Sequence, residues 1–471
     1  MAFKYDKVFF GGYVVDPQNR RKGFFDVATK DGKIVAVGVE LDRTMAKEAI
    51  DASGMHVLPG IIDCHVHLAG ENGVYGHRML AAAGVTTALE IAGPIGEAID
   101  AIKSGGTGLN IAILDQIRPG VSVADENPDL QTIEDFIGRC LEEGGLGVKI
   151  LGGHYPLTPE ATARAIEAAD NSTAYISFHA GTKATGSDLN GALEAIELAG
   201  GRPLHLAHVN SYCRGTVKKC WLEAEDMIAA LIKNPNIRPE SYIATLNGCS
   251  AHCADGVPSS LVTRRCLRAG GFAETDQGME QAILGDWAQI NINASGMIEP
   301  VTGPKALEYW RGKGTDCEVS FGVNPPEARY RLAVAKKDNG SFVVDCLGTD
   351  GGIFPRNVIV SMGLSLVKLS AWTIEEFVLK TSINPAKWFA LPDKGHFSEG
   401  ADADISIVDF ANQKPITTVV GGNIIMHRGV IIPHPTTVIT TQIGRKAIEA
   451  AGLKTHIIDI TDTGYFKGMG K

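Results

Sequence analysis

The chain is organised around eleven residues, Leu58-Pro59-Gly60-Ile61-Ile62-Asp63-Cys64-His65-Val66-His67-Leu68. The run from Ile61 to Leu68 is apolar enough for a buried strand, and Pro59-Gly60 marks its beginning. Because His65 and His67 are two residues apart, both imidazoles lie on the same face of that strand. Two neutral imidazoles on one face form half of a divalent metal site. Two histidines packed in a core give the same pattern, so the remaining ligands must be found elsewhere in the chain.

Composition and charge narrow the class of protein. The chain has 471 residues, of which 44% are hydrophobic and 21% charged, as in an ordinary globular protein. This length predicts a large barrel or several domains. The formal net charge of -10, without basic runs, argues against nucleic acid or an anionic membrane surface as a partner. No membrane span or signal peptide is visible, so we expect a cytoplasmic protein whose nine cysteines are reduced.

From Pro59 onward, apolar strand-like runs alternate with helix-like segments, which is typical of a parallel α/β fold. Eight strands are predicted at residues 61–68, 86–91, 110–114, 147–151, 174–179, 203–209, 242–246 and 342–350. Helices are predicted between several of them, at residues 159–170, 189–199 and 222–232. The pattern predicts a (β/α)8 TIM-type barrel over residues 59–390. The long segment at about 247–340 is expected to form a substrate loop or a lid.

Both chain ends are β-like. Residues 1–58 contain short strands, and Asp31-Gly32 between alternating runs indicates a hairpin. Residues 391–471 return to the same kind of sequence after the barrel. We expect the two ends to pair into one small β-sandwich domain. Residues 436–471 have no clear place, and either the barrel or a neighbouring subunit could receive them.

Six metal-ligand or ionisable side chains lie near the carboxyl ends of the predicted barrel strands. Those ends share one rim, where the catalytic groups of such barrels lie. Each residue falls within or at the end of an apolar run, where a charge or an imidazole is costly without a partner. The six residues are His65, His67, Lys149, His179, His208 and Asp350. We expect them to converge on a metal site.

Lys149 is the informative member of this set. In Gly147-Val148-Lys149-Ile150-Leu151 it occupies the middle of a buried strand, where the pKa of an ammonium group falls. The neutral amine can add carbon dioxide to give a carbamate, an anion with two oxygens that can bridge two metals. The alternative is a lysine held in the core by a salt bridge.

His205 competes with His208 for a place in the site. The two are three residues apart, so a regular strand would turn them to opposite faces and only one would point into the barrel. We choose His208, which is nearer the strand end. His205 is then expected to pack between strand and helix.

Taken together, these motifs resemble the amidohydrolase superfamily, in its binuclear branch with a carboxylated lysine, which contains dihydroorotases, hydantoinases and N-acyl-amino-acid deacylases. The matching text comprises residues 58–67, Gly84-Val85-Thr86-Thr87, Gly147-Val148-Lys149, His179, His208-Val209-Asn210-Ser211, Asp350, Asn384-Pro385-Ala386-Lys387 and residues 400–404. After the aspartate, Asp350-Gly351-Gly352 is closer to the deacylases, whose lysine context differs from this one. The sequence therefore lies between subgroups.

The resemblance implies one metal held by His65, His67 and Asp350, a second held by His179 and His208, and a Lys149 carbamate that bridges them. It implies two divalent ions, zinc in our prediction, and carbon dioxide for the carbamate. A hydroxide between the metals would attack a carbonyl carbon. Asp350 would be the catalytic residue that passes the proton to the leaving nitrogen.

Five further residues are candidates for substrate contact, each with a structural alternative: His154, Tyr155, Asn247, His252 and Arg214. In hydantoinases a tyrosine close to the lysine helps to hold the oxyanion, and here His154 or Tyr155, or neither, would do so. The Arg214 guanidinium is well shaped for a carboxylate but is also consistent with a solvated loop. Glu90 could accept the second ring N–H of His65 or His67, or could be an ordinary paired carboxylate.

We therefore expect a metal-dependent hydrolase of a C–N bond other than a peptide bond. Its small-molecule substrate is a cyclic amide, a cyclic imide or an N-acyl amino acid, and the chain is expected to form a homo-oligomer. One alternative is a hydrolytic deaminase of a heterocycle, although superfamily deaminases normally lack the lysine ligand. The other is a catalytically inactive assembly protein, which would be expected to lack ligands.

Overall fold

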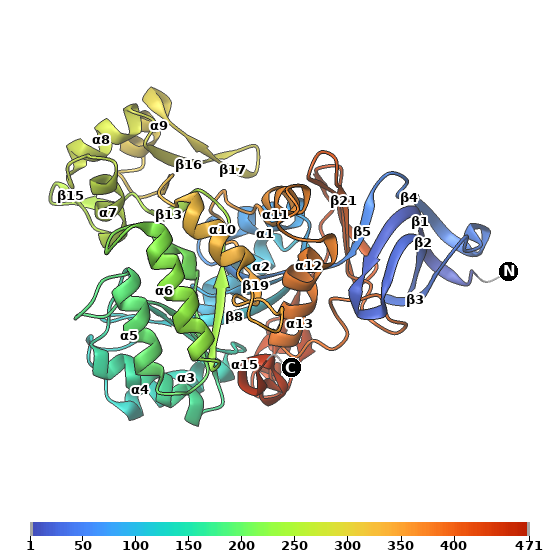
Figure 1. The fold of residues 1–471 in the computed structure, drawn as a ribbon, viewed down its shortest axis with the longest axis horizontal. Coiled ribbons are helices and arrows are strands. Elements are labelled where there is room, and N and C mark those ends of the chain that lie inside the picture. Colours follow the sequence, from blue (N-terminus) through green and yellow to red (C-terminus); the bar gives the residue numbers. More distant parts are fainter. Residues whose placement is uncertain (1–2, 469–471) are drawn as a thin grey trace.

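The protein is elongated, with a central curled sheet between two smaller β-containing parts (Figure 1). The structure, a computed structural model, describes residues 3–468. The N-terminal strands lie at one end of the molecule, and the segment with α7, α8 and α9 lies at the other. The mixed α/β class agrees with the prediction from sequence.

A curled parallel sheet forms the centre. Its strands follow one another in chain order: β6 (Ile61–His67), β7 (Val85–Glu90), β8 (Asn110–Ile117), β9 (Gly147–Leu151), β10 (Tyr175–His179), β11 (Leu204–Leu206) and β12 (Ile237–Ser241). Both faces are covered, which is why these strands, with the exception of β12, read as nearly continuous apolar runs. The carboxyl ends of the strands share one rim, as in a TIM-type barrel.

Residues 346–352 pair with both edges of this sheet. β19 (Cys346–Leu347) runs parallel to β12, and β20 (Gly351–Gly352) runs parallel to β6. The three residues between these short strands, 348–350, include the predicted ligand Asp350. Of the eighth predicted strand, residues 342–350, only β19 is formed, and β20 follows directly after its predicted end.

The predicted strand at residues 242–246 is wrong. The seventh strand is β12, Ile237–Ser241, where Ile237 pairs with Leu204 of β11. Its sequence, Ile-Arg-Pro-Glu-Ser, has one apolar side chain and a proline, so it gives no signal of a buried strand. This strand forms because it pairs with its neighbours in the sheet, not because of its own sequence pattern.

Helices cover the outside of the curled sheet. They are α1 (Gly73–Ala82), α2 (Ile95–Gly105), α3 (Leu130–Glu142), α4 (Pro159–Asn171), α5 (Leu189–Ala199), α6 (Cys220–Lys233), α10 (Pro326–Val334), α11 (Ile359–Lys368), α12 (Ile374–Val378) and α13 (Asn384–Trp388). The helices predicted at 159–170, 189–199 and 222–232 correspond to α4, α5 and α6. Within residues 3–468, the helices are too short or too polar to cross a bilayer.

The two chain ends share one sheet. Its order is β24-β23-β22-β21-β5-β1-β2-β3, and β4 also pairs with β1. From the N-terminal part come β1 (Tyr5–Asp16), β2 (Arg21–Lys30), β3 (Lys33–Gly38), β4 (Ala46–Asp51) and β5 (His56–Pro59). From the C-terminal part come β21 (Ile405–Asp409), β22 (Lys414–Val420), β23 (Asn423–His427) and β24 (Val430–Ile431). β5 joins the two parts by pairing with both β1 and β21.

The last segment returns to the central sheet. β25 (Thr437–Thr440) pairs with β8 and with β26 (Lys454–Ile457), and α14 (Arg445–Ala450) connects them. In α15 (Gly464–Lys467), the Tyr465 hydroxyl donates to the Pro203 carbonyl at 2.9 Å. The tail therefore packs on the central sheet.

The segment predicted as a loop or lid is a folded unit. It contains an antiparallel sheet of β13 (Asn247–Ser250), β18 (Glu318–Phe321), β16 (Ala288–Ala294) and β17 (Met297–Val301). It also contains α7 (Leu261–Ala269), α8 (Asp276–Leu284) and α9 (Gly303–Gly312) around a hydrophobic cluster of its own. One edge of the unit, formed by β13 and α7, faces the rim of the central sheet.

Candidate metal centre

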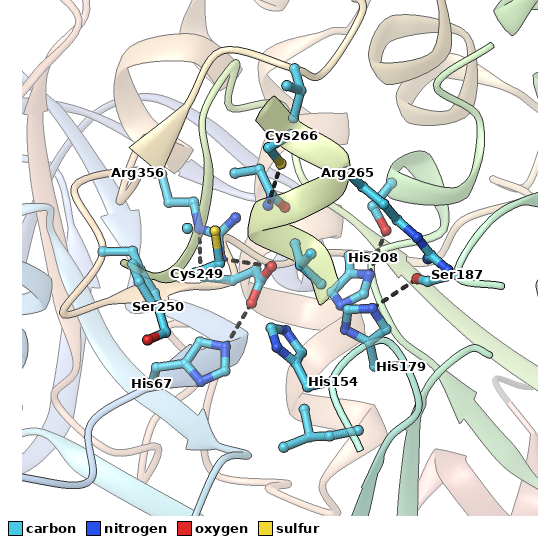
Figure 2. Close-up of a pocket in the computed structure, with 18 of the residues that line it drawn as sticks. His67, His154, His179, Ser187, His208, Cys249, Ser250, Arg265, Cys266 and Arg356 are labelled. Atoms are coloured by element: carbon cyan, nitrogen blue, oxygen red, sulfur yellow. Dashed lines mark hydrogen bonds and ion pairs between the residues drawn. The ribbon is translucent and has the colours of Figure 1, made fainter. Parts of the chain in front are cut away.

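A cavity of about 310 Å³ opens at the carboxyl ends of the strands, and all six predicted ligand residues line it. Figure 2 shows His179 and His208 side by side in this cavity, across from His67 and Arg356. The six side chains come from β6, β9, the end of β10 and the segments after β11 and β19. Residues far apart in the sequence thus converge on one rim.

His65 and His67 point toward the same carboxylate. Oδ1 of Asp350 is 3.1 Å from Nε2 of His65 and 2.7 Å from Nε2 of His67. The ligand atoms of His65, His208 and Asp350 all lie within 4.8 Å of one another, and all three residues are buried. Two imidazoles and a carboxylate at this spacing form a donor set suited to a divalent ion.

Asp350 is held in place by the residues around it. Its backbone has φ 53°, a conformation that a non-glycine residue adopts rarely and that clusters at functional sites. Next to it, Thr349 donates its N–H to Asp63 on β6 at 3.0 Å. On the other side, the Arg356 guanidinium lies 2.8 Å from Oδ2 of Asp350. Burial opposes ionisation, but Arg356 and His65 hold the pKa of Asp350 well below its usual range.

Two fully buried lysines, Lys149 and Lys380, differ in whether Nζ already has hydrogen-bond partners, and this decides which of them can carry a carbamate. Burial lowers the pKa of both Lys149 and Lys380 to about 8. Nζ of Lys380 donates to the carbonyls of Ala333 at 3.0 Å and Val344 at 2.6 Å. Nζ of Lys149 has no hydrogen-bond partner within the described residues, although it points into the cavity. A buried polar atom is rarely left in this way, so Lys149 fits a further chemical group on its nitrogen.

His179 and His208 form the other side of the site. His179 ends β10, and its Nε2 lies 2.9 Å from the Ser187 hydroxyl. Nδ1 of His208 lies 2.8 Å from the Ser211 hydroxyl. Burial lowers the pKa of both imidazoles well below the ordinary value, so both are neutral at physiological pH. The neutral form is the one that binds a metal.

The structure places His208, and not His205, in the cavity lining, although the strand-alternation argument behind that choice does not apply. β11 ends at Leu206, and His208 has φ 34°, so the alternation of a strand no longer applies between them. The ring of His65 lies 5.1 Å from that of His208 and 6.3 Å from that of His205. His205 lies deeper, 3.1 Å from the Tyr175 hydroxyl and against Trp388 of α13. His205 does not line the cavity, whereas His208 does.

Glu240, a carboxylate that the sequence did not reveal, contacts two of the metal-ligand residues without lining the cavity itself. Oε1 of Glu240 on β12 is 2.5 Å from Nδ1 of His65 and accepts the backbone N–H of His208 at 2.5 Å. The sequence left Glu90 open as a partner of His65 or His67 or as an ordinary paired carboxylate. Instead, Glu90 accepts backbone N–H groups, including that of Gly93 at 3.0 Å. Glu240 was missed because its strand was misplaced; its position within β12 was the signal that could have found it.

Replacing Glu240 with glutamine is expected to weaken metal binding by about 10- to 100-fold, the usual cost of losing a carboxylate that orients a metal ligand. The shape of the side chain and its accepting oxygen are retained, but the neutral amide lacks the negative charge that strengthens the hydrogen bond to His65 and raises the basicity of that metal ligand. Competition with a chelator measures the affinity, and circular dichroism checks the fold. A well-folded variant with wild-type affinity would show that Glu240 does not orient His65.

Four of the five predicted substrate contacts line the cavity: His154, Tyr155, Asn247 and Arg214. Arg214 donates to Asn247 at 2.8 Å and to Asn324 at 2.9 Å. His252 does not line the cavity; its Nδ1 lies 3.4 Å from the Thr315 hydroxyl on the folded insertion. It is therefore not brought to the site. After β13 ends at Ser250, the chain enters a short hairpin in which Cys253–Ala254 pairs with Val257–Pro258, which the sequence alone does not reveal.

Arg265 is a further cavity residue that the sequence did not single out. It lies on α7 of the insertion, and its guanidinium group ends near Ser187 in Figure 2. Neither Arg214 nor Arg265 forms an ion pair with a carboxylate of residues 3–468, in a chain of net charge -10. Two such guanidinium groups favour an anionic group in the cavity.

The curled sheet and its donor set define the class, a metal-binding hydrolase with its site at the carboxyl ends of parallel strands. Comparisons with known proteins agree. The sequence profile of the amidohydrolase family matches residues 56–425, so the chain belongs to the amidohydrolase family. It is an enzyme that hydrolyses carbon–nitrogen bonds other than peptide bonds.

Individual relatives are similar to this chain only at low sequence identity. The chain is 25% identical to a dihydroorotase of Citrifermentans bemidjiense over 444 residues, covering 86% of this chain and 89% of the relative. It is 24% identical to an allantoinase of Bacillus velezensis over 417 residues, covering 81% of each. An N-acyl-D-glutamate deacylase from Bordetella bronchiseptica, solved with zinc and a phosphonate inhibitor, has a TM-score of 0.66 at 15% identity, covering 92% and 99%. The last similarity shows the fold alone.

Proposed function

We propose that the enzyme opens a cyclic amide or removes the acyl group of an N-acyl amino acid, and that its substrate carries a carboxylate. The observation that carries the proposal is the convergence of six donor side chains with two arginines in one cavity. His65, His67 and Asp350 hold one divalent ion, and His179 and His208 hold the other. When bound, the two ions, zinc in our proposal, polarise the substrate carbonyl and activate water.

Lys149 supplies the bridging group. Its neutral amine adds carbon dioxide, forming one N–C bond and releasing one proton, to give a carbamate anion. Three features support this step: the complete burial of Lys149, its pKa of about 8 and its unpartnered Nζ. The carbamate oxygens provide polar contacts at a buried position where Nζ has no hydrogen-bond partner.

Asp350 moves the proton. Its Oδ1 faces His65 and His67, where it accepts a proton from the attacking water and delivers it to the leaving nitrogen. Arg356 holds Oδ2 and keeps the carboxylate ionised between turnovers. The polar hydrogens of His154 and Tyr155, which line the same cavity, are available to the carbonyl oxygen.

Arg214 and Arg265 bind the carboxylate of the substrate. Both line the cavity, one from the segment after β11 and the other from α7, without a carboxylate partner among the described residues. A guanidinium group binds a carboxylate through paired N–H donors. The insertion therefore contributes to substrate choice rather than to the metal ligands.

A hydrolysis screen on metal-replete enzyme tests the proposal. It compares cyclic imides, lactams and N-acyl D- and L-amino acids, each beside an analogue whose carboxylate is amidated. We expect hydrolysis of at least one of these classes, with the carboxylate form preferred by about tenfold or more, which corresponds to about 1.4 kcal/mol. A preference for the amidated analogues would show that the arginines do not bind the substrate carboxylate.

Closure of the barrel, the domain bounds, the location and the oligomeric state remain proposals. The curled sheet is proposed to close as a (β/α)8 barrel, because residues 346–352 pair with both edge strands. We place the barrel at residues 59–390 and the small β-sandwich domain at residues 1–58 and 391–471 without the tail from residue 436 on, whose described part, 436–468, pairs with β8 of the central sheet. Residues 1–2 and 469–471 lie outside the described part. A cytoplasmic location and a homo-oligomeric state stay predictions.

A further inference from the structure

A second cavity, of about 620 Å³, adjoins the metal cavity on the side of His67. Its wall comes from the segments that follow β6, β7 and β8 and from the insertion. The two cavities share six lining residues, which are His67, Ala92, Tyr155, Cys249, Ser250 and Phe354. A molecule whose carbonyl group lies at the metal ligands can therefore extend into the second cavity.

Two aromatic side chains stand at the junction of the cavities, and each is held by a neighbour. The centre of the Phe354 ring lies 5.5 Å from that of the His67 ring. Phe354 also packs against Gly248, where an added Cβ atom would overlap the ring. The Arg118 guanidinium lies over the Tyr155 ring, 4.3 Å from its centre. The junction is thus bordered by rings whose positions the surrounding chain determines.

The insertion and the rim of the central sheet form the second cavity together. Nδ2 of Asn72, in the segment after β6, donates to both carboxylate oxygens of Glu318 on β18, at 3.0 and 3.1 Å. The backbone N–H of Ile298 on β17 donates to Sδ of Met79 on α1 at 3.4 Å. These contacts hold the insertion against α1 and the neighbouring rim, so the second cavity has a built wall on both sides.

Polar side chains supply donors and acceptors to the second cavity. The wall includes Asn72, Arg118, Asn293, Lys313, Asp316 and Glu318. Since groups of both charge signs are present, the wall does not favour a ligand of one charge. It suits a neutral polar group such as an amide, which donates and accepts at once. An alkyl chain would instead displace water from these groups without replacing its hydrogen bonds.

The second cavity and the arginines lie on opposite sides of the metal cavity. Figure 2 shows His67 and Ser250 at one side, and His179 and Arg265 at the other. In an N-acyl amino acid, the carboxylate belongs to the amine part, and the acyl chain leaves the carbonyl carbon in the other direction. A substrate whose carboxylate binds Arg214 and Arg265 therefore directs its acyl chain toward the second cavity.

We propose that the second cavity binds the acyl chain of an N-acyl amino acid, and that this chain is extended and carries hydrogen-bonding groups. The inference rests on the proposed function, because it takes the reacting carbonyl to lie at the metals and the carboxylate at the arginines. It separates the two substrate classes, since a small cyclic amide needs only the metal cavity of about 310 Å³. Ser250, which lines both cavities, is the specificity-determining residue at their junction.

Binding of ligands that cannot be cleaved tests the second cavity. Three 4-oxo acids mimic N-acylglycines with the scissile nitrogen replaced by a methylene group: 4-oxopentanoate, 4-oxodecanoate and 7-acetamido-4-oxoheptanoate. The last two have chains of equal length and differ in the amide group. In calorimetric titrations of the metal-replete wild-type enzyme, we expect the acetamido ligand to bind about tenfold more tightly than either of the others, the effect of one or two net hydrogen bonds.

Two tryptophan variants locate the effect. Ser250→Trp places a bulky ring at the junction from an exposed position, and it should bring the affinity ratio of the acetamido ligand to 4-oxodecanoate close to one. Glu308→Trp adds the same ring at an exposed position of α9 that lines neither cavity, and it should keep the wild-type ratio. Circular dichroism checks the fold of both variants.

Two results would overturn the inference. One is a wild-type enzyme that binds 4-oxodecanoate as tightly as the acetamido ligand, which decides the matter even if the variants fail to fold. The other is a well-folded Ser250→Trp enzyme with the wild-type ratio. Hydrolysis of small cyclic amides together with either result would leave the proposed function standing. Failure of the whole hydrolysis screen would reject the proposed function, whereas the affinity ratio is measured without any hydrolysis.

Discussion

Replacing Lys149 with alanine is expected to lower kcat/KM by more than about 100-fold, the upper cost of losing a group that merely orients a metal ligand. The loss is larger because Lys149 supplies a ligand itself, and the second metal is expected to bind weakly. A short carboxylic acid with added metal should restore part of the activity, because its carboxylate can take the place of the missing carbamate. Steady-state kinetics and metal content, each with and without propionate, measure both effects.

Lys380 offers a matched control for Lys149. Both lysines are fully buried and both have a pKa lowered to about 8, but Nζ of Lys380 is already bonded to two carbonyls. Lys380→Ala should lose stability, since two buried carbonyls lose their donor, yet it should keep its metals and show no response to propionate. A Lys149→Ala enzyme with full activity and full metal would show that Lys149 is not the bridging group.

Replacing Asp350 with asparagine is expected to lower kcat by about 10²–10⁴-fold, the contribution of a positioned acid–base group. Asparagine keeps the size of the side chain but cannot take the proton. The position itself should persist, because Thr349 remains bonded to Asp63 and Arg356 remains bonded to the backbone carbonyl of residue 350. Kinetics at saturating metal and saturating substrate measure the change, so that weaker metal binding does not contribute.

Asp345→Asn is the control variant for the kcat of Asp350→Asn. Asp345 is a mostly buried carboxylate only five residues earlier, and it does not line the cavity. Its replacement should leave kcat within about twofold, as expected for a site away from the chemistry. If Asp350→Asn retained wild-type kcat with both metals bound, another group would have to carry the proton.

The sequence predicted most of the central sheet because its strands are buried on both faces. β9 occupies the predicted residues 147–151, and β6 differs from its prediction by one residue. The exception was β12, whose Arg238, Pro239 and Glu240 hide a strand that pairing with β11 determines. The insertion was also beyond the sequence signal, since its sheet order, β13-β18-β16-β17, depends on contacts between distant segments.

Whether a site residue could be predicted also depended on the sequence around it. His65, His67, Lys149 and Asp350 were visible because an ionisable side chain within an apolar run demands a partner. Glu240 was invisible inside a polar strand. Arg265 and Cys266 lie on an amphipathic helix, where only the packing of the insertion against the rim turns them toward the cavity. The alternation argument for His205 and His208 failed because β11 ends at Leu206, before the predicted strand end at residue 209.

Metal content of the purified enzyme tests the central claim most directly. Elemental analysis after exhaustive dialysis, with protein concentration from amino-acid analysis, gives the number of divalent ions per chain. We predict close to two per chain in the wild type, with zinc as the main element, and a value near one or below in Lys149→Ala. A wild-type enzyme that hydrolyses its substrate with no bound metal would contradict the account.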